Sequence, residues 1–156
     1  MSETVITNDL LSFLSKKEFL YLGTCDSSGM PFVVPKFLIR IIGSTIYLAD
    51  YVMGRTCENL KSNPKVSLSI INLESLIGYE MNGYAEMLVG GDEFDEILKD
   101  LEKRKMHFSV ERIIAGVQRG KSHQVFEGEF PEQLAVLIIK VKQIIHISPS
   151  GCIKKT

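Results

Sequence analysis

Gly54, Arg55 and Thr56 have the residue types and the spacing that could bind a phosphate group. They open a short helix expected over 55–62, between two segments whose apolar residues alternate as in strands. The start of a helix presents unpaired backbone N–H groups and the positive end of its dipole, which suit an anion. Arg55 would add a fixed cation with forked donors, and Thr56 would add a hydroxyl. The alternative on these residues alone is that Thr56 caps the helix while Arg55 is a solvated surface charge.

Strands must make up most of the framework that positions this helix. Pro35 breaks the second strand and marks an edge or a bulge, because proline cannot donate to a ladder. Gly83 is expected at a bulge in one long fifth strand. A sheet of five or six antiparallel strands would most simply curl into a barrel, since closure removes its edges. The expected strands are 19–25, 32–42, 44–50, 66–71, 79–89 and 134–147, and the expected helices are 10–17, 55–62, 92–105 and 110–118, with a loop over 119–133.

Length and composition indicate one domain over 1–156, since a chain of 156 residues can bury a real core. The net charge of −1 and the lack of a basic stripe argue against a nucleic-acid surface. No signal peptide or membrane-spanning apolar run is visible, so the cytoplasm is the expected compartment. Cys25, Cys57 and Cys152 lack the paired spacing of a disulfide framework or a zinc site. Cys57 is expected to be a buried apolar residue, although a helix N-terminus would lower its pKa if it were exposed.

Three stretches of the chain stand in an order that is typical of one family. The first is Val33-Val34-Pro35-Lys36 in a strand, and the second is Met53-Gly54-Arg55-Thr56 at a helix start, followed by Asn59-Leu60 and Asn63-Pro64. The third is Gly78-Tyr79-Glu80-Met81-Asn82-Gly83-Tyr84-Ala85-Glu86 in a later strand. In this order the chain resembles the FMN-binding split-barrel proteins related to pyridoxamine 5′-phosphate oxidase. The resemblance runs from about Leu10 to Val89 and returns more weakly in the last strand.

The resemblance implies a mainly β fold with peripheral helices: a six-stranded antiparallel split β-barrel that acts as a homodimer, with FMN at the subunit interface. Arg55 and Thr56 would hold the FMN phosphate, and the strand over 33–36 would line the isoalloxazine ring, largely through backbone groups. Lys36 would either place a cation near the end of the ring that becomes negative on reduction, or be a solvated strand lysine. Asp50, Tyr51 and Met53 would border the ribityl chain and the ring. The cofactor-binding residues carried over by position are Val33, Val34, Pro35, Lys36, Asp50, Tyr51, Met53, Gly54, Arg55, Thr56 and Asn59.

The implied function is a flavin-dependent oxidoreductase or an electron-transfer protein acting on a small molecule, with FMN supplying the chemistry. No Ser/His/Asp or Cys/His arrangement is visible, so no catalytic residue is predicted. One alternative is a non-catalytic cofactor-binding module, such as a flavin carrier, a haem-binding protein or a redox sensor, and another is a dimeric barrel that has lost its cofactor. A deazaflavin would suit the same phosphate donors. Pyridoxamine phosphate is not predicted as the substrate, because the Arg/His pattern of the oxidases is not evident over 144–149.

Histidines and a basic loop complete the candidate residues. His107, His123 and His146 are the candidates for an axial haem ligand. Arg119, Lys121 and His123 form a basic loop that would cover the cofactor, contact an anionic substrate or remain solvated. Neither pattern names a substrate or an electron donor.

Overall fold

Alternating apolar residues build an antiparallel sheet that closes on itself. The computed structural model describes residues 6–120, 133–151 and 153–155. Within these residues the elements are α1 (Asn8–Ser15), β1 (Phe19–Cys25), β2 (Pro31–Ile42), β3 (Thr45–Asp50), α2 (Arg55–Ser62), β4 (Lys65–Asn72), β5 (Ile77–Leu88), α3 (Asp92–Gln118), β6 (Ala135–Ile147) and β7 (Ile153–Lys155).

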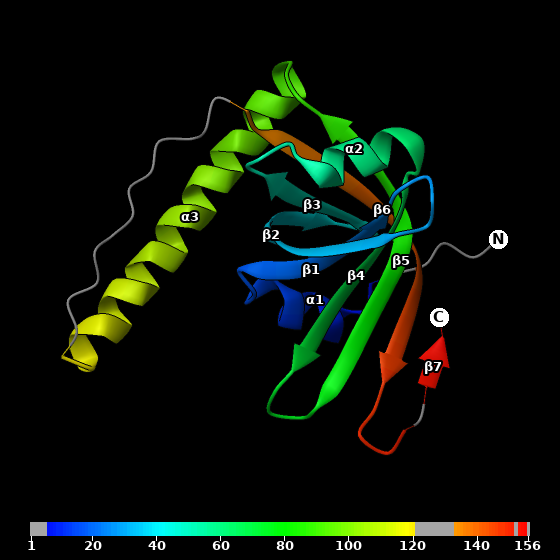
Figure 1. Ribbon diagram of the computed structural model, residues 1–156. Coiled ribbons are helices and arrows are strands. Elements are labelled where there is room, and N and C mark those ends of the chain that lie inside the picture. The colour runs from blue at the N-terminus through cyan, green and yellow to red at the C-terminus, as the bar shows by residue number, and fades with distance from the viewer. Residues whose placement is uncertain (1–5, 121–132, 152, 156) are drawn as a thin grey trace.

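The sheet has the strand order β3-β2-β1-β4-β5-β6-β7, and β3 also pairs with β6 (Figure 1). The second pairing runs from Thr45 opposite Lys140 to Asp50 opposite Ala135, and it closes β1–β6 into a barrel without free edges there. β7, which the sequence analysis did not predict, pairs with the far end of β6 outside the closed barrel. The expected fold class is confirmed: a mainly β chain with peripheral helices and a six-stranded antiparallel split β-barrel.

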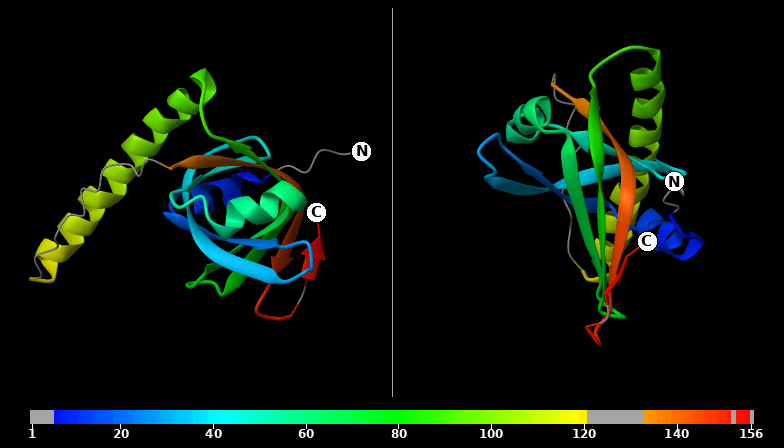
Figure 2. Two further views of the ribbon diagram at one scale, coloured as in Figure 1. Left: turned by 45° about the horizontal axis from the view of Figure 1, so that its top comes forward. Right: turned by 90° about the vertical axis from the view of Figure 1, so that its right-hand side faces the viewer.

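Two helices cover the ends of the barrel and contribute to its core. The interior is filled by leucine and isoleucine side chains such as Leu22, Leu48 and Ile139, each fully buried. Leu14 of α1 and Leu60 of α2 belong to the same cluster, and Figure 2 shows α2 lying across one opening. Burying a side chain of this size is worth about 1.5–3 kcal/mol, so both helices are held to the barrel by its core.

α3 packs against the outside of the barrel, where Phe108 meets Phe37 of β2 edge-to-face at 6.3 Å between ring centroids. The prediction of two helices, 92–105 and 110–118, is wrong, because α3 is one continuous helix from Asp92 to Gln118. Apolar residues up to Phe108 face the barrel, whereas Val110, Ile114 and Val117 lie on the exposed side. The change of apolar face, and not a break in the backbone, separates the two periodic segments.

Two strand irregularities were expected, and both need qualification. β2 is not broken at Pro35, and its bulge lies between Leu38 and Arg40. Pro35 does lie at an edge of the sheet, because this part of β2 pairs with β1 alone. β5 and β6 shift register beside Gly83, as expected, although the extra residue belongs to β6. A Cβ atom on Gly83 would lie 2.2 Å from the Lys140 carbonyl oxygen, so the close approach of the two strands requires glycine.

None of the helices in the described ranges is both long enough and apolar enough to cross a membrane. The predicted loop over 119–133 falls largely outside the described residues.

Candidate cofactor-binding site

The start of α2 is open to an anion. Gly54 is its N-cap residue, and no side chain caps the first turn, so backbone N–H groups there lack the partner that a capping oxygen would supply. Thr56 lies inside the helix and is buried, so the alternative in which Thr56 caps α2 is wrong. The turn before the helix is tight, with Met53 at a φ of 47°, a conformation that a non-glycine residue adopts only when its surroundings hold it.

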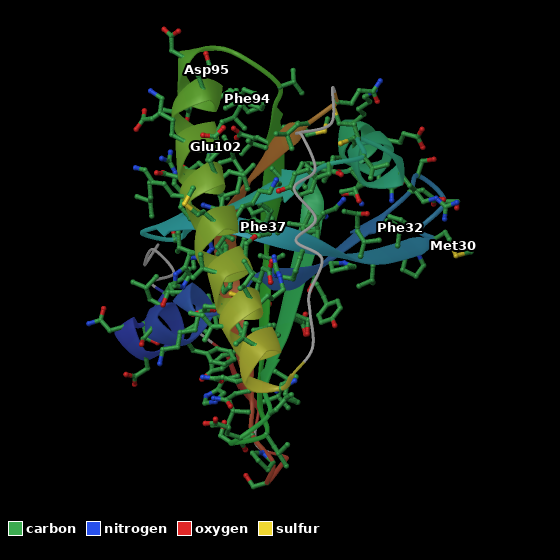
Figure 3. The ribbon with its side chains drawn as sticks, turned by 90° about the vertical axis from the view of Figure 1, so that its left-hand side faces the viewer. Met30, Phe32, Phe37, Phe94, Asp95 and Glu102 are labelled. Carbon is green, nitrogen blue, oxygen red and sulfur yellow. The ribbon has the colours of Figure 1, made fainter. Side chains whose placement is uncertain are left out.

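Arg55 is exposed at this helix start and is oriented by an aromatic ring. Its guanidinium lies 5.0 Å from the centre of the Phe32 ring, a cation–π contact that holds the side chain along the end of β2. Figure 3 shows Phe32 near the end of β2 that projects from the barrel, with Phe37 further along the strand under α3. Sequence reasoning missed Phe32, because only the folded strand brings it beneath Arg55.

The half of β2 beside this helix has an open backbone edge. Residues 31–37 pair with β1, and β3 joins the other edge of the strand only from Phe37 onward. Peptide groups on that edge are therefore available to a ligand, and strong peptide donors and acceptors need partners. Val33 and Pro35 are exposed, while Val34 and Lys36 point to the opposite face of the strand. The backbone, and not four adjacent side chains, is what this strand can present to a planar ring.

Lys36 is neither a free cation nor a solvated lysine. Its ammonium lies 2.8 Å from Oδ1 of Asp50, and the exposed fractions of the two side chains are 11% and 0%. Asp50 also accepts hydrogen bonds from the backbone N–H groups of Val52 and Met53, and from the Cys57 thiol at 3.3 Å. The carboxylate thus supports the turn before α2 from inside the protein and does not reach the surface.

The environment of Asp50 sets two pKa values. Burial would raise the pKa of Asp50, but the hydrogen bond and charge of Lys36 outweigh it and hold that pKa below the usual 3.8. Burial, followed by the neighbouring Asp50, raises the pKa of Cys57 to about 12. Cys57 is therefore a buried protonated thiol and not a reactive thiolate at the helix start. The prediction that Cys57 is a buried residue is confirmed.

Two other predicted residues have structural partners. Asn59 is buried and donates its amide to the Thr24 hydroxyl at 3.0 Å, which fastens α2 to β1. Tyr51 packs against the cluster beneath α3, and burial, with a smaller effect of Glu18, raises its pKa to about 12. The structure therefore gathers Arg55, Gly54 and the open edge of β2 on the surface, with Asp50 and Asn59 supporting them from within.

A groove on the outer face of the sheet was not predicted. It has a volume of about 560 Å³ and crosses β1, β2, β4, β5 and β6. Small outward-facing residues, Gly23 and Ser67 among them, leave room between the larger exposed side chains of Val33 and Tyr84. Glycine and serine at alternate strand positions were the available signal, but it could be interpreted only once the strand neighbours were known. Its lining residues are Gly23, Thr24, Cys25, Pro31, Val33, Lys65, Val66, Ser67, Asn82, Gly83, Tyr84, Lys142 and Gln143.

Comparison with known protein families gives a match over residues 6–145, to the family described as pyridoxamine 5′-phosphate oxidase. The chain belongs to this family. The predicted resemblance is thus confirmed over nearly the whole chain.

Proteins with structures similar to this member of the pyridoxamine 5′-phosphate oxidase family are described as binding different groups. An uncharacterized protein of Methanocaldococcus jannaschii, MJ0282, is 27% identical over 101 residues, which cover 63% of this chain and 66% of the relative. The structure of an FMN-binding, oxidase-related protein of Nostoc punctiforme is similar with a TM-score of 0.60 and 13% identity, over 100% of this chain and 98% of that one. A haem-binding protein of Mycobacterium smegmatis has a TM-score of 0.60 and 16% identity, over 92% of this chain and 54% of that one. These two structures show a shared fold.

The two histidines of this family member that the structure describes stand apart from the groove. His107 is exposed on α3 beside Glu111, and the ring of His146 stacks on Tyr79 with 5.0 Å between centroids. Neither of them lines the groove. His123 and Lys121 lie outside the described residues, and Arg119 is the C-cap residue of α3.

Proposed function

We propose that this protein is a flavoprotein that binds FMN, with the phosphate at the start of α2 and the isoalloxazine ring along the open edge of β2. The observation that carries the proposal is the uncapped first turn of α2, with Arg55 stacked on Phe32 beside unpaired strand backbone. These groups fit the two parts of the cofactor, because cations and helix N–H groups suit phosphate while peptide groups suit the polar edge of the ring. Bound FMN would supply hydride or single-electron transfer.

The residues of this chain would position the cofactor and exclude water. Arg55 would offset the phosphate charge, and Val33 and Pro35 would cover the apolar part of the ring. Lys36 adds no net charge there, because its ion pair with Asp50 is already complete. Peptide N–H groups of β2 would then be the donors to the ring. We propose electron transfer to or from a small molecule as the activity, with the cytoplasm as its compartment.

We further propose a homodimer in which a second copy covers the outer face of the sheet. Tyr21, Val33 and Tyr84 are large side chains on this face with exposed fractions of 55%, 62% and 46%. Val33 borders the groove and also belongs to the open stretch of β2, so a subunit seated here would lie against the proposed ring site. Extended exposed apolar patches of this kind are typical of subunit interfaces.

The test is an equilibrium titration of the protein with FMN, followed by gel filtration and an absorption spectrum. We expect flavin bands to elute with the protein. Arg55→Ala should weaken FMN binding roughly ten- to a hundredfold, since a hydrogen bond to a charged group contributes about 1.5–3 kcal/mol. Lys61→Ala is the matched control, because it removes a cation from the opposite end of the same helix. It should leave the affinity unchanged.

Two results would contradict the proposal. Equal FMN affinity of the wild type and Arg55→Ala would remove the phosphate assignment. A haem-type absorption band, with no flavin retained after loading, would instead favour the haem-binding alternative.

A further inference from the structure

A second, smaller cavity is lined by residues of α1, β2 and α3. Figure 1 shows α1 at the end of the barrel away from α2. Its volume is about 110 Å³. That is room for a few water molecules or for one small polyatomic ion, because a water molecule occupies about 30 Å³ in the liquid. The lining residues are Leu11, Ser15, Leu38, Arg40, Ile41 and Arg104. Two of these six are arginines, brought together from a strand and a helix that are distant in sequence.

Arg40 reaches the cavity from β2 with part of its guanidinium unused. One terminal nitrogen, Nη1, donates to Asp100 of α3 at 2.9 Å, and the guanidinium lies 4.6 Å from the centre of the Tyr47 ring. Its Nε is buried and has no hydrogen-bond partner. An unpaired buried donor costs stability, so native proteins leave few of them without a bound group.

Arg104 reaches the cavity from α3 and has the same feature. Its Nη2 donates to the carbonyl oxygens of Ser15 and Lys17 at 2.9 and 2.7 Å, which ties α3 to the end of α1. Its Nε is buried without a partner. Burial lowers the pKa of Arg104, and Glu18 opposes this only in part. Within the described part of the chain, no carboxylate lies at ion-pair distance from Arg104.

The charges around the cavity are therefore unequal. Asp100 balances Arg40, and the nearby Glu18 is already paired with Arg112. Arg104 remains as a half-buried cation that has no carboxylate partner among the described residues, and its guanidinium lies 5.1 Å from the centre of the Phe108 ring. A water molecule would satisfy an Nε–H donor, but it would leave this partly desolvated charge without a counter-ion. An anion would meet both requirements.

We propose that this cavity is a binding site for a small oxyanion of the phosphate or sulfate class, held between Arg40 and Arg104. Guanidinium groups present planar pairs of donors that match the oxygens of such ions. The bound ion would connect β2 with α3, and through the Arg104 contacts it would also hold α1. The site is separate from the α2 start, so it can be tested without reference to FMN.

The experiment titrates the protein with inorganic phosphate at constant ionic strength, and follows the arginine Nε–H signals by nitrogen–proton correlation NMR. An Arg55→Ala background removes the cation at the α2 start. We expect saturable shifts of the Arg40 and Arg104 signals, while the Arg112 signal stays in place. Arg104→Lys should weaken phosphate binding about tenfold, because lysine can still donate to the Ser15 and Lys17 carbonyls but lacks the planar donor pair.

Arg112→Lys is the matched control, since it makes the same change on the same helix, at a residue paired with Glu18 outside the cavity. It should bind phosphate as the wild type does. Absence of saturable shifts at Arg40 and Arg104, or equal shifts at all three arginines, would overturn the proposal. The wild-type NMR titration decides the question even if Arg104→Lys does not fold.

Discussion

Asp50, the last residue of β3, connects that strand with three other parts of the candidate site: β2, the turn before α2, and α2 itself. Its carboxylate pairs with Lys36 and accepts from the turn and from Cys57. Asp50→Asn would leave the Lys36 charge buried without a counter-ion. We expect the variant to lose about 3–5 kcal/mol of unfolding free energy at neutral pH, measured by urea denaturation.

The same prediction has a pH dependence with a definite sign. Because the folded-state pKa of Asp50 lies below 3.8, its contribution is complete at neutral pH and is lost as the pH falls through that lowered pKa. The stability difference between wild type and Asp50→Asn should therefore narrow in acid. Glu102→Gln, an exposed acid on α3 (Figure 3), serves as the control and should change stability little. A difference that stays constant down to strongly acidic pH would contradict the Lys36 pairing.

At the scale of elements, Gly83 allows β5 and β6 to approach each other at the register shift. A methyl group there would meet the Lys140 carbonyl, so Gly83→Ala must push the two strands apart. We expect a loss of about 2–3 kcal/mol in a thermal or urea unfolding experiment. Gly78→Ala in the same strand is the control, because its Cβ would find an ordinary contact at 3.7 Å from Ile147. Equal losses in both variants would show that glycine flexibility, and not the close approach, is responsible.

Strands were the most predictable elements, because alternation of apolar residues depends only on neighbours in sequence. The apolar pattern predicts two helices where α3 is one. Phe108 faces the barrel while Val110 and Val117 face outward, and a periodic pattern cannot distinguish a change of face from a change of helix. In the site, Arg55 and the helix start could be predicted from a local motif. The Lys36–Asp50 pair could not, because it depends on which faces two strands turn toward each other.

At the scale of the whole molecule, the proposed dimer places the second copy over the groove. Tyr21→Glu should convert the dimer to a monomer, measured by light scattering with gel filtration, because the carboxylate on that face would be desolvated in the interface. FMN retention should fall in the same variant if the partner helps to enclose the ring.

Val117→Glu provides the matched comparison for this surface. Val117 is 73% exposed on the outward side of α3, away from the groove. The variant should remain dimeric and keep FMN. Dissociation by Val117→Glu, with Tyr21→Glu still dimeric, would move the interface to α3.

The insertion of α3 between β5 and β6 has a consequence for how the chain folds. These two strands share the ladder from Gly78 opposite Ile147 to Leu88 opposite Val136, yet a long helix separates them in sequence. Closing such a loop costs chain entropy before the ladder can compensate for it. The hairpins β1–β2, β2–β3 and β4–β5 need only short loops. We therefore expect them to form early, with β6 entering last between β5 and β3, so that the rate of refolding is the rate at which the barrel closes.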